Sequence, residues 1–301
     1  IGAGAWGTAL AATARRAGHD VKLYARESEV VEAINTTGEN TVFLPGIKLP
    51  DGIFATPNLE AAVYGADAVL LVVPSQFMRS VAESLNELMP DEMPVILASK
   101  GIEQKSLKLM NEVVEEAMPN HPLAALAGPS FAAEVARGQP AALTLACADE
   151  GLGAHLMENL ASPMFRIYLS NDVVGAEIGG AVKNVLAIAC GIIEGRKFGD
   201  NARAALITRG LAELIRLGEA KGAEMETMIG LGGLGQKPQD VLAGRKAVTE
   251  GVANAISVTQ LAAKLNIEMP ICETVHAIIH EGQSIDDAMH ALMQRPLRPE
   301  F

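Results

Sequence analysis

The fold is decided by the stretch IGAGAWGTAL at residues 1–10, in which Gly2, Gly4 and Gly7 form the pattern G-x-G-x-x-G. A helical pattern, TALAATARRAG (8–18), follows at once. In a strand–turn–helix unit, the first glycine permits a tight turn, the second lets the backbone approach a pyrophosphate, and the third lets the helix pack closely on the strand. We therefore predict a dinucleotide-binding unit here, with an ordinary glycine-rich turn as the alternative.

The residues around this turn predict a sheet made of short apolar strands. Ile1 has the character of a strand end, so we expect further residues of that strand to precede it. Up to about residue 170, apolar runs such as ADAVLLVVP (66–74) and PVILAS (94–99) alternate with amphipathic helical segments. Continuous apolar strands separated by helices are typical of a mostly parallel sheet that helices cover on both faces.

Beyond about residue 170 the pattern changes to helices alone, with apolar residues repeating near every 3.6 positions. We therefore predict an α/β protein with two domains. Residues 1–170 form a Rossmann-type domain with a mostly parallel sheet, and residues 171–301 form an all-helical domain that contributes to substrate binding and catalysis.

The composition of the chain limits which classes of partner and which cellular compartment are expected. The 301 residues carry a net charge of −12, which disfavours nucleic acid and anionic membranes, because phosphate binding needs a basic face. The longest apolar runs are shorter than the roughly 20 residues that cross a bilayer, so we expect no membrane span. Three widely separated cysteines without C-x-x-C spacing argue against disulfides and a zinc site, so we expect no metal and a cytoplasmic location.

Any phosphorylated ligand of so acidic a chain needs local positive charge, and Arg26 offers it beside the glycine turn. Arg26 ends the predicted strand VKLYARES (21–28), where an NAD-preferring enzyme often carries an acidic residue. Its guanidinium can pair with the 2′-phosphate of NADP, so NADP is favoured over NAD. Glu27 beside it keeps NAD open, as does the alternative of a solvated surface arginine.

Polar residues also follow two later strands. Lys100 comes directly after VILAS (95–99), and Gly128 and Ser130 follow an apolar run in LAGPSFAAEV (126–135). Because ligands of open α/β sheets lie beyond the carboxyl ends of the strands, we expect these residues to face one crevice and an anionic substrate. The alternatives are a solvated Lys100 and a Ser130 that merely caps the next helix.

The second half has one outstanding feature, a lysine inside an apolar helix. Lys183 and Asn184 interrupt GAEIGGAVKNVLAIACG (175–191), which is otherwise small and apolar. Burial lowers the pKa of a lysine towards the range useful for proton transfer, so Lys183 is the candidate general acid and base. Asn184 can orient the substrate. The alternative is a lysine whose amine reaches solvent at the helix edge.

These segments, taken in order, resemble the bacterial NAD(P)-dependent glycerol-3-phosphate dehydrogenases over nearly the whole chain. The matching segments are GAGAWGTALA (2–11), VVPS (72–75), ASKGIE (98–103), AGPSFAAEVARGQPAA (127–142), GGAVKNVLAIACGI (179–192) and NARAALITRGLAE (201–213). The resemblance implies reversible hydride transfer between NAD(P)H and dihydroxyacetone phosphate. The product, sn-glycerol 3-phosphate, feeds glycerophospholipid synthesis, and the enzyme is expected to be a cytoplasmic homodimer.

The resemblance also implies roles for individual residues. Lys183 matches the proton-transferring lysine of the family, and Lys100, Gly128 and Ser130 line the substrate site with it. Besides the three glycines, the implied cofactor contacts are Ala5, Trp6, Arg26, Lys100, Ala132, Val248 and Glu250. Position 5 departs mildly, because the family often has serine there.

One departure is larger. After IGLGGLG (229–235) the family continues with an aspartate, a threonine-rich turn and a Ser-Arg-Asn triplet, whereas this chain reads QKPQDVLAG (236–244). A true deletion would impair phosphate binding, so we expect instead that a binding loop is missing from this sequence. Two other functions stay open: a β-hydroxyacid dehydrogenase, whose asparagine usually stands one helical turn after its lysine, and a non-catalytic NADP sensor.

Overall fold

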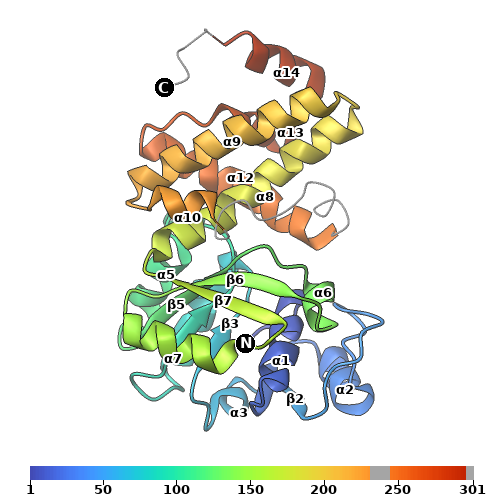
Figure 1. Cartoon of the computed structure of the whole chain (residues 1–301), viewed down its shortest axis with the longest axis vertical. Coiled ribbons are helices and arrows are strands. Elements are labelled where there is room, and N and C mark those ends of the chain that lie inside the picture. The colour runs from blue at the N-terminus through green and yellow to red at the C-terminus, as the bar shows by residue number, and fades with distance from the viewer. Residues whose placement is uncertain (231–244, 296–301) are drawn as a thin grey trace.

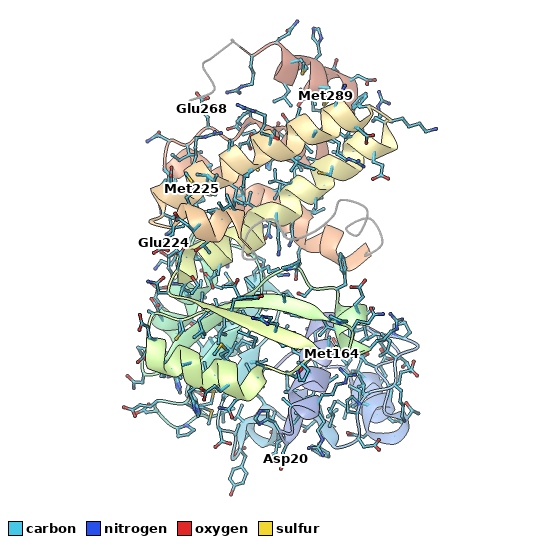
Figure 2. The ribbon with its side chains drawn as sticks, viewed as in Figure 1. Asp20, Met164, Glu224, Met225, Glu268 and Met289 are labelled. Atoms are coloured by element: carbon cyan, nitrogen blue, oxygen red, sulfur yellow. The ribbon has the colours of Figure 1, made fainter. Side chains whose placement is uncertain are left out.

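The structure is a computed structural model that describes residues 1–230 and 245–295, with the backbone alone for 245–249. Strands and their covering helices form one half of the molecule, and helices alone form the other half (Figure 1). Asp20 and Met289 lie at opposite ends of the long axis in Figure 2.

The first half is built on parallel strands. β1 (Val21–Tyr24) pairs with β2 (Ile53–Thr56), and a second sheet has the order β3-β4-β5-β6-β7. The strands of the second sheet are β3 (Val69–Leu71), β4 (Val95–Leu97), β5 (Leu123–Ala127), β6 (Ala141–Ala146) and β7 (Phe165–Ser170). Every neighbouring pair is parallel except β5 and β6, which confirms the mostly parallel sheet predicted from the sequence.

Ile1 joins the two sheets. Its nitrogen donates to the Leu70 oxygen at 2.7 Å, and its oxygen accepts from the Val72 nitrogen at 2.9 Å. On the other side, the Gly2 nitrogen donates to the Tyr24 oxygen at 3.1 Å. Ile1 therefore occupies a strand position between β1 and β3, as its sequence context predicted, and the glycine turn opens at the carboxyl edge of the sheet.

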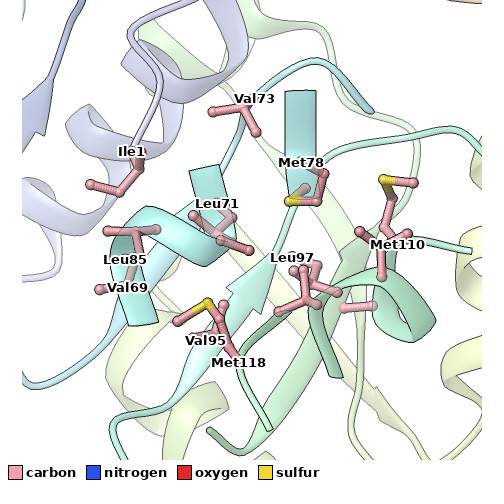
Figure 3. Close-up of a cluster of buried hydrophobic side chains, with 14 of the residues drawn as sticks. Ile1, Val69, Leu71, Val73, Met78, Leu85, Val95, Leu97, Met110 and Met118 are labelled. Carbon is pink, nitrogen blue, oxygen red and sulfur yellow. The ribbon is translucent and has the colours of Figure 1, made fainter. Parts of the chain in front are cut away.

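Alternation along β4 explains how both faces of the sheet are buried. Val95 and Leu97 point into one cluster with Leu71, Met78 and Leu85, all at most 1% exposed (Figure 3). Ile96 points the other way, into a second cluster that contains residues of the opposite helices. The helices of this half are α1 (Ala5–Arg16), α2 (Ser28–Thr37), α3 (Leu59–Val63), α4 (Met78–Asn86), α5 (Met110–Ala117), α6 (Ala132–Ala136) and α7 (Glu150–Leu160), with a 3₁₀ turn, η1 (Ser75–Phe77).

The second half packs around one long helix, α8 (Val173–Gly195), which contacts α12, α9, α13 and α10 as well as β5. Its partners are α9 (Asp200–Ala220), α10 (Met225–Ile229), α12 (Arg245–Lys264), α13 (Pro270–His280) and α14 (Ile285–Met293). One buried carboxylate fixes two of these helices. Asp172 accepts from the Gly175 nitrogen at 2.7 Å, which caps α8, and from the Glu224 nitrogen at 2.8 Å, just before α10.

The length of α8 corrects one expectation from the sequence. Its 23 residues are long and apolar enough to span a membrane by length and composition, although no single apolar run reaches that length. The reason is that Lys183 and Asn184 interrupt the apolar run, yet the mean hydropathy of the helix stays as high as that of a membrane span. In the structure 78% of the apolar window is buried within the protein, so α8 is a core helix.

The halves meet around the segment after β4. Ile102 and Leu109 from this segment are fully buried in the helical cluster, together with Ile178 and Val182 of α8. The segment thus packs with both halves of the molecule. The division at residue 170 stays a prediction, and it agrees with the position of the link between β7 and α8.

Candidate functional site

The glycine turn distinguishes what the fold requires from what a ligand requires. A Cβ atom on Gly2, whose φ is +104°, would lie 2.6 Å from the Val72 oxygen, and one on Gly7 would lie 1.8 Å from the Gly2 oxygen. A Cβ on Gly4 would meet no described atom within 4 Å. The fold therefore demands glycine at positions 2 and 7, whereas at position 4 there is open space into which a ligand can come close to the backbone.

This open space lies at the N-terminus of α1. Gly4 is the N-cap, and no side chain among the described residues caps the helix. Uncapped amides at a helix N-terminus favour an anion such as a pyrophosphate. Trp6, in the first turn, has a buried Nε1 without a hydrogen-bond partner among the described residues. Both observations fit a dinucleotide cofactor, for which Gly4, Trp6 and the partly buried Ala5 would supply contacts.

Arg26 follows β1 at the same edge of the sheet. Its side chain is 80% exposed, and one guanidinium nitrogen lies 3.1 Å from a carboxylate oxygen of Glu27. The residue is therefore placed where a 2′-phosphate could be met, yet in the structure it makes the ion pair of a surface arginine. The geometry leaves both interpretations of Arg26 open.

Lys183 bridges the two halves. Its side chain is only 7% exposed, and its Nζ donates to the backbone oxygen of Gly128, after β5, at 3.1 Å. Gly128 has a φ of +152°, and a Cβ there would lie 2.9 Å from the Leu143 Cα. Glycine at this position is therefore required by the close packing of the strand end against β6. The alternative of an amine that reaches solvent is excluded for Lys183.

Lys100 lies beside Lys183. Its aliphatic chain passes over Gly180 of α8, where a Cβ would be 3.2 Å from the Lys100 Cγ. Burial lowers the pKa of Lys183 well below its usual range, and the charge of Lys100 lowers it further. Burial also lowers the pKa of Lys100. Of the two amines, Lys183 is the better candidate for the neutral form, because its pKa is lowered further.

α12 brings a negative charge to the pair. It crosses α8 so closely that a Cβ on Gly251 would lie 2.7 Å from the backbone oxygen of Asn184. Glu250 precedes this contact, and the negative charge of its carboxylate opposes the lowering of the pKa of both Lys100 and Lys183. Asn184 is 9% exposed at the crossing. Its proposed role in orienting substrate stays a prediction.

The remaining predicted site residues make fewer contacts that the structure describes. Ser130 does not cap α6, because the N-cap is Phe131; its hydroxyl lies 3.5 Å from the Gly128 oxygen. The capping alternative for Ser130 was therefore wrong. Ala132 begins α6 and is partly buried. Val248 lies in α12, but its side chain is outside the described residues, as is the segment that follows Gly235.

Two residues of the site escaped the sequence interpretation. Asn254 on α12 is 1% exposed, and Gly101 after Lys100 has a φ of +147°. A Cβ on Gly101 would lie 2.8 Å from Asn254 Oδ1. The one signal in the sequence is the spacing of four from Glu250, which puts Asn254 on the same face of a helix.

A cofactor-binding glycine turn on a mostly parallel sheet, joined to a helical half that supplies a buried lysine, defines a two-part nicotinamide-dependent dehydrogenase. The family model described as NAD-dependent glycerol-3-phosphate dehydrogenase N-terminus matches residues 1–152. The corresponding C-terminus model matches residues 172–238 and 234–290. The chain belongs to the NAD-dependent glycerol-3-phosphate dehydrogenase family.

Relatives and solved structures agree with this assignment. The chain is 52% identical to a protein of Caulobacter vibrioides and 50% identical to one of Rhodospirillum rubrum, both named glycerol-3-phosphate dehydrogenase [NAD(P)+]. All of the chain is aligned in each case, with 97% and 93% of the relative. The crystal structure of glycerol-3-phosphate dehydrogenase from Coxiella burnetii is 36% identical, with a TM-score of 0.90, over 98% of this chain and 97% of that one. D-mandelate dehydrogenase, at 15% identity and a TM-score of 0.65, shares the fold alone.

The comparisons also bear on the segment after Gly235. The alignment with the Rhodospirillum rubrum protein runs over 323 positions, more than the 301 residues of this chain. The match to the C-terminus model is interrupted where residues 172–238 meet residues 234–290. Together these observations support the expectation that relatives carry residues here that this sequence lacks.

Proposed function

We propose that this chain catalyses reversible hydride transfer between NAD(P)H and dihydroxyacetone phosphate, with sn-glycerol 3-phosphate as the product. The observation that carries the proposal is the buried Lys183, whose Nζ meets the Gly128 oxygen at 3.1 Å beside a second lysine. The product is the backbone precursor of glycerophospholipids, and its formation is the role that the family supports for this chain.

The chemistry divides between cofactor and protein. When bound, the nicotinamide supplies the hydride. Negative charge then develops on the ketone oxygen of the substrate, and the Nζ of Lys183 donates a proton to it. In the reverse direction the neutral amine of Lys183 accepts the proton of the hydroxyl. One proton is taken up for each ketone reduced, which balances the reaction.

The lysine pair also couples proton donation to substrate binding. Lys183 has a low pKa because it is buried beside the charge of Lys100. A phosphate dianion bound near these side chains would raise the pKa of both amines, because an opposite charge favours the protonated form. Lys183 would then hold its proton when the substrate is present. Lys100, Gly128, Ser130 and Asn184 would orient the substrate.

We infer NADP as the preferred cofactor, with the exposed guanidinium of Arg26 as its 2′-phosphate partner. We also infer a cytoplasmic homodimer. The cysteines Cys147, Cys190 and Cys272 are free and buried, which supports a reducing compartment. Phe198 and Ile207 are exposed on the helical half, which supports an interface there.

The test follows the absorbance of NADPH with dihydroxyacetone phosphate, then with NADH, and then follows NADP⁺ reduction with 3-hydroxyisobutyrate. Rapid NADPH oxidation with the phosphorylated ketone is the expected result. Turnover of 3-hydroxyisobutyrate alone would instead favour the β-hydroxyacid dehydrogenases. Tight NADPH binding without oxidation by any phosphorylated ketone would favour a sensor.

A further inference from the structure

Asn254 is a buried amide that the proposed chemistry does not use. It lies on α12 and is 1% exposed. Its Nδ2 donates to the backbone oxygen of Ala181 on α8 at 3.3 Å. Its Oδ1 is buried and has no hydrogen-bond partner among the described residues. A buried acceptor left unpaired lowers stability, so a role for this amide at the helix crossing must offset that cost.

Asn254 lies close to the neighbours of Lys100 both in the loop and on α8. In the chain, Gly101 follows Lys100, and the position of a Cβ on Gly101 is 2.8 Å from Asn254 Oδ1 and 2.5 Å from Ser75 Oγ. On α8, Ala181 follows Gly180, over which the Lys100 chain passes. Asn254 therefore lies against Gly101, the residue after Lys100 in the loop, and bonds to Ala181, the residue after Gly180 on α8.

Other bonds fix the same loop from the sheet side and from α12. Ser99 Oγ donates to the Val73 oxygen at 2.5 Å, and Gln76 Nε2 donates to the Ile102 oxygen at 2.9 Å. Gln104 Nε2 reaches the Ala253 oxygen on α12 at 3.3 Å. These hydrogen bonds hold the chain on both sides of Lys100, whereas Asn254, which is bonded to α8, packs against the loop at Gly101, the residue after Lys100.

We propose that Asn254 is a positioning residue that fixes Lys100 against α8 and so sets the separation between Lys100 and Lys183. This role rests on the proposed function, because Lys100 and Lys183 act together on the substrate. The charged groups that act on Lys183 are Lys100 and, from α12, Glu250. A substitution of Asn254 would move Lys100 relative to the amine of Lys183, which transfers the proton.

The proposal is tested by a double-mutant cycle. Asn254→Ala should lower kcat/KM for dihydroxyacetone phosphate by roughly 10- to 100-fold, as small misplacements of catalytic groups do. In a Lys100→Ala background the same substitution should have no further effect, because Asn254 acts through Lys100. Ser257→Ala is the control: it removes another buried polar group of α12, whose bond goes to the backbone of its own helix, and should leave kcat/KM unchanged.

The proposal would be overturned if the double variant lost kcat/KM by the product of the two single losses. It would also be overturned if Ser257→Ala lost as much kcat/KM as Asn254→Ala. The same cycle is measured calorimetrically on binding of glycerol 3-phosphate, so that it decides the role of Asn254 even if the wild-type chain fails to turn over dihydroxyacetone phosphate. That failure would overturn only the proposed function.

A second variant serves if Asn254→Ala does not fold. Asn254→Asp keeps the shape but adds a negative charge beside Lys100, which raises the pKa of the lysine pair. Ketone reduction needs protonated Lys183 and falls as pH rises through its pKa, so this fall should move to higher pH. An unmoved pH profile would contradict the proposal.

Discussion

The glycine turn allows a sharp test, because the fold and the cofactor make separable demands on it. Gly4 has φ −64° and ψ 179°, which alanine adopts readily, and its Cβ would meet nothing within 4 Å. Gly4→Ala should therefore change the free energy of unfolding by about 1 kcal/mol or less. The added methyl group would, however, occupy the space through which a pyrophosphate approaches the backbone.

Gly7→Ala should behave differently. Its Cβ would lie 1.8 Å from the Gly2 oxygen, far inside ordinary contact at 3.4 Å, so α1 must move away from the turn. Overpacking of this kind costs ~1–3 kcal/mol or more. We expect Gly7→Ala to lower both stability and cofactor affinity, whereas Gly4→Ala lowers cofactor affinity alone, by at least about tenfold, or ~1.4 kcal/mol.

The assays are thermal unfolding and a fluorescence titration with NADPH. Gly195→Ala is the matched control, because it ends α8 and its Cβ also meets nothing within 4 Å. Alanine should stabilise that position slightly and leave the Kd for NADPH unchanged. A Gly4→Ala variant that binds NADPH as tightly as the wild type would refute the placement of the cofactor at this turn.

Two further predictions follow from charged groups. Arg26→Gln should raise the Kd for NADPH by about tenfold and leave that for NADH unchanged, since the guanidinium can pair only with the 2′-phosphate; equal changes in both titrations would remove Arg26 from the site. Burial raises the pKa of Glu177 on α8, which accepts from the Asn111 nitrogen at 3.0 Å, to about 8. Its stabilising effect is therefore full below its ordinary pKa near 4.5 and is lost as pH rises through about 8. Between pH 6 and 9, the free energy of unfolding of Glu177→Gln should fall less than that of the wild type, as measured by chemical denaturation. An equal fall in both proteins would contradict the claim that the carboxyl of Glu177 is neutral below its raised pKa.

Much of the fold could be read from the sequence because local patterns agreed with the tertiary arrangement. The apolar run around Ile96 is buried on both faces, as a central parallel strand requires. Lys183 could be predicted because burying an amine in an apolar helix costs desolvation free energy, which a structural lysine at the surface avoids. Its burial is confirmed.

What could not be predicted depends on contacts between distant segments. Asn254 gains its place only through the crossing of α12 over α8, and Gly101 gains its constraint from side chains far away in the chain. Glu213 on α9 is likewise 1% exposed and accepts from the Ile271 and Cys272 nitrogens at the start of α13. No spacing within one helix reveals such a partner.

The most direct measurement concerns the amine of Lys183. In Lys183→Ala, NADPH oxidation by dihydroxyacetone phosphate should fall by ~100- to 10,000-fold, the usual contribution of a general acid, while the Kd for NADPH stays the same. Lys264→Ala, an exposed lysine in the last turn of α12, should turn over like the wild type. Undiminished turnover in Lys183→Ala would show that the proton comes from elsewhere.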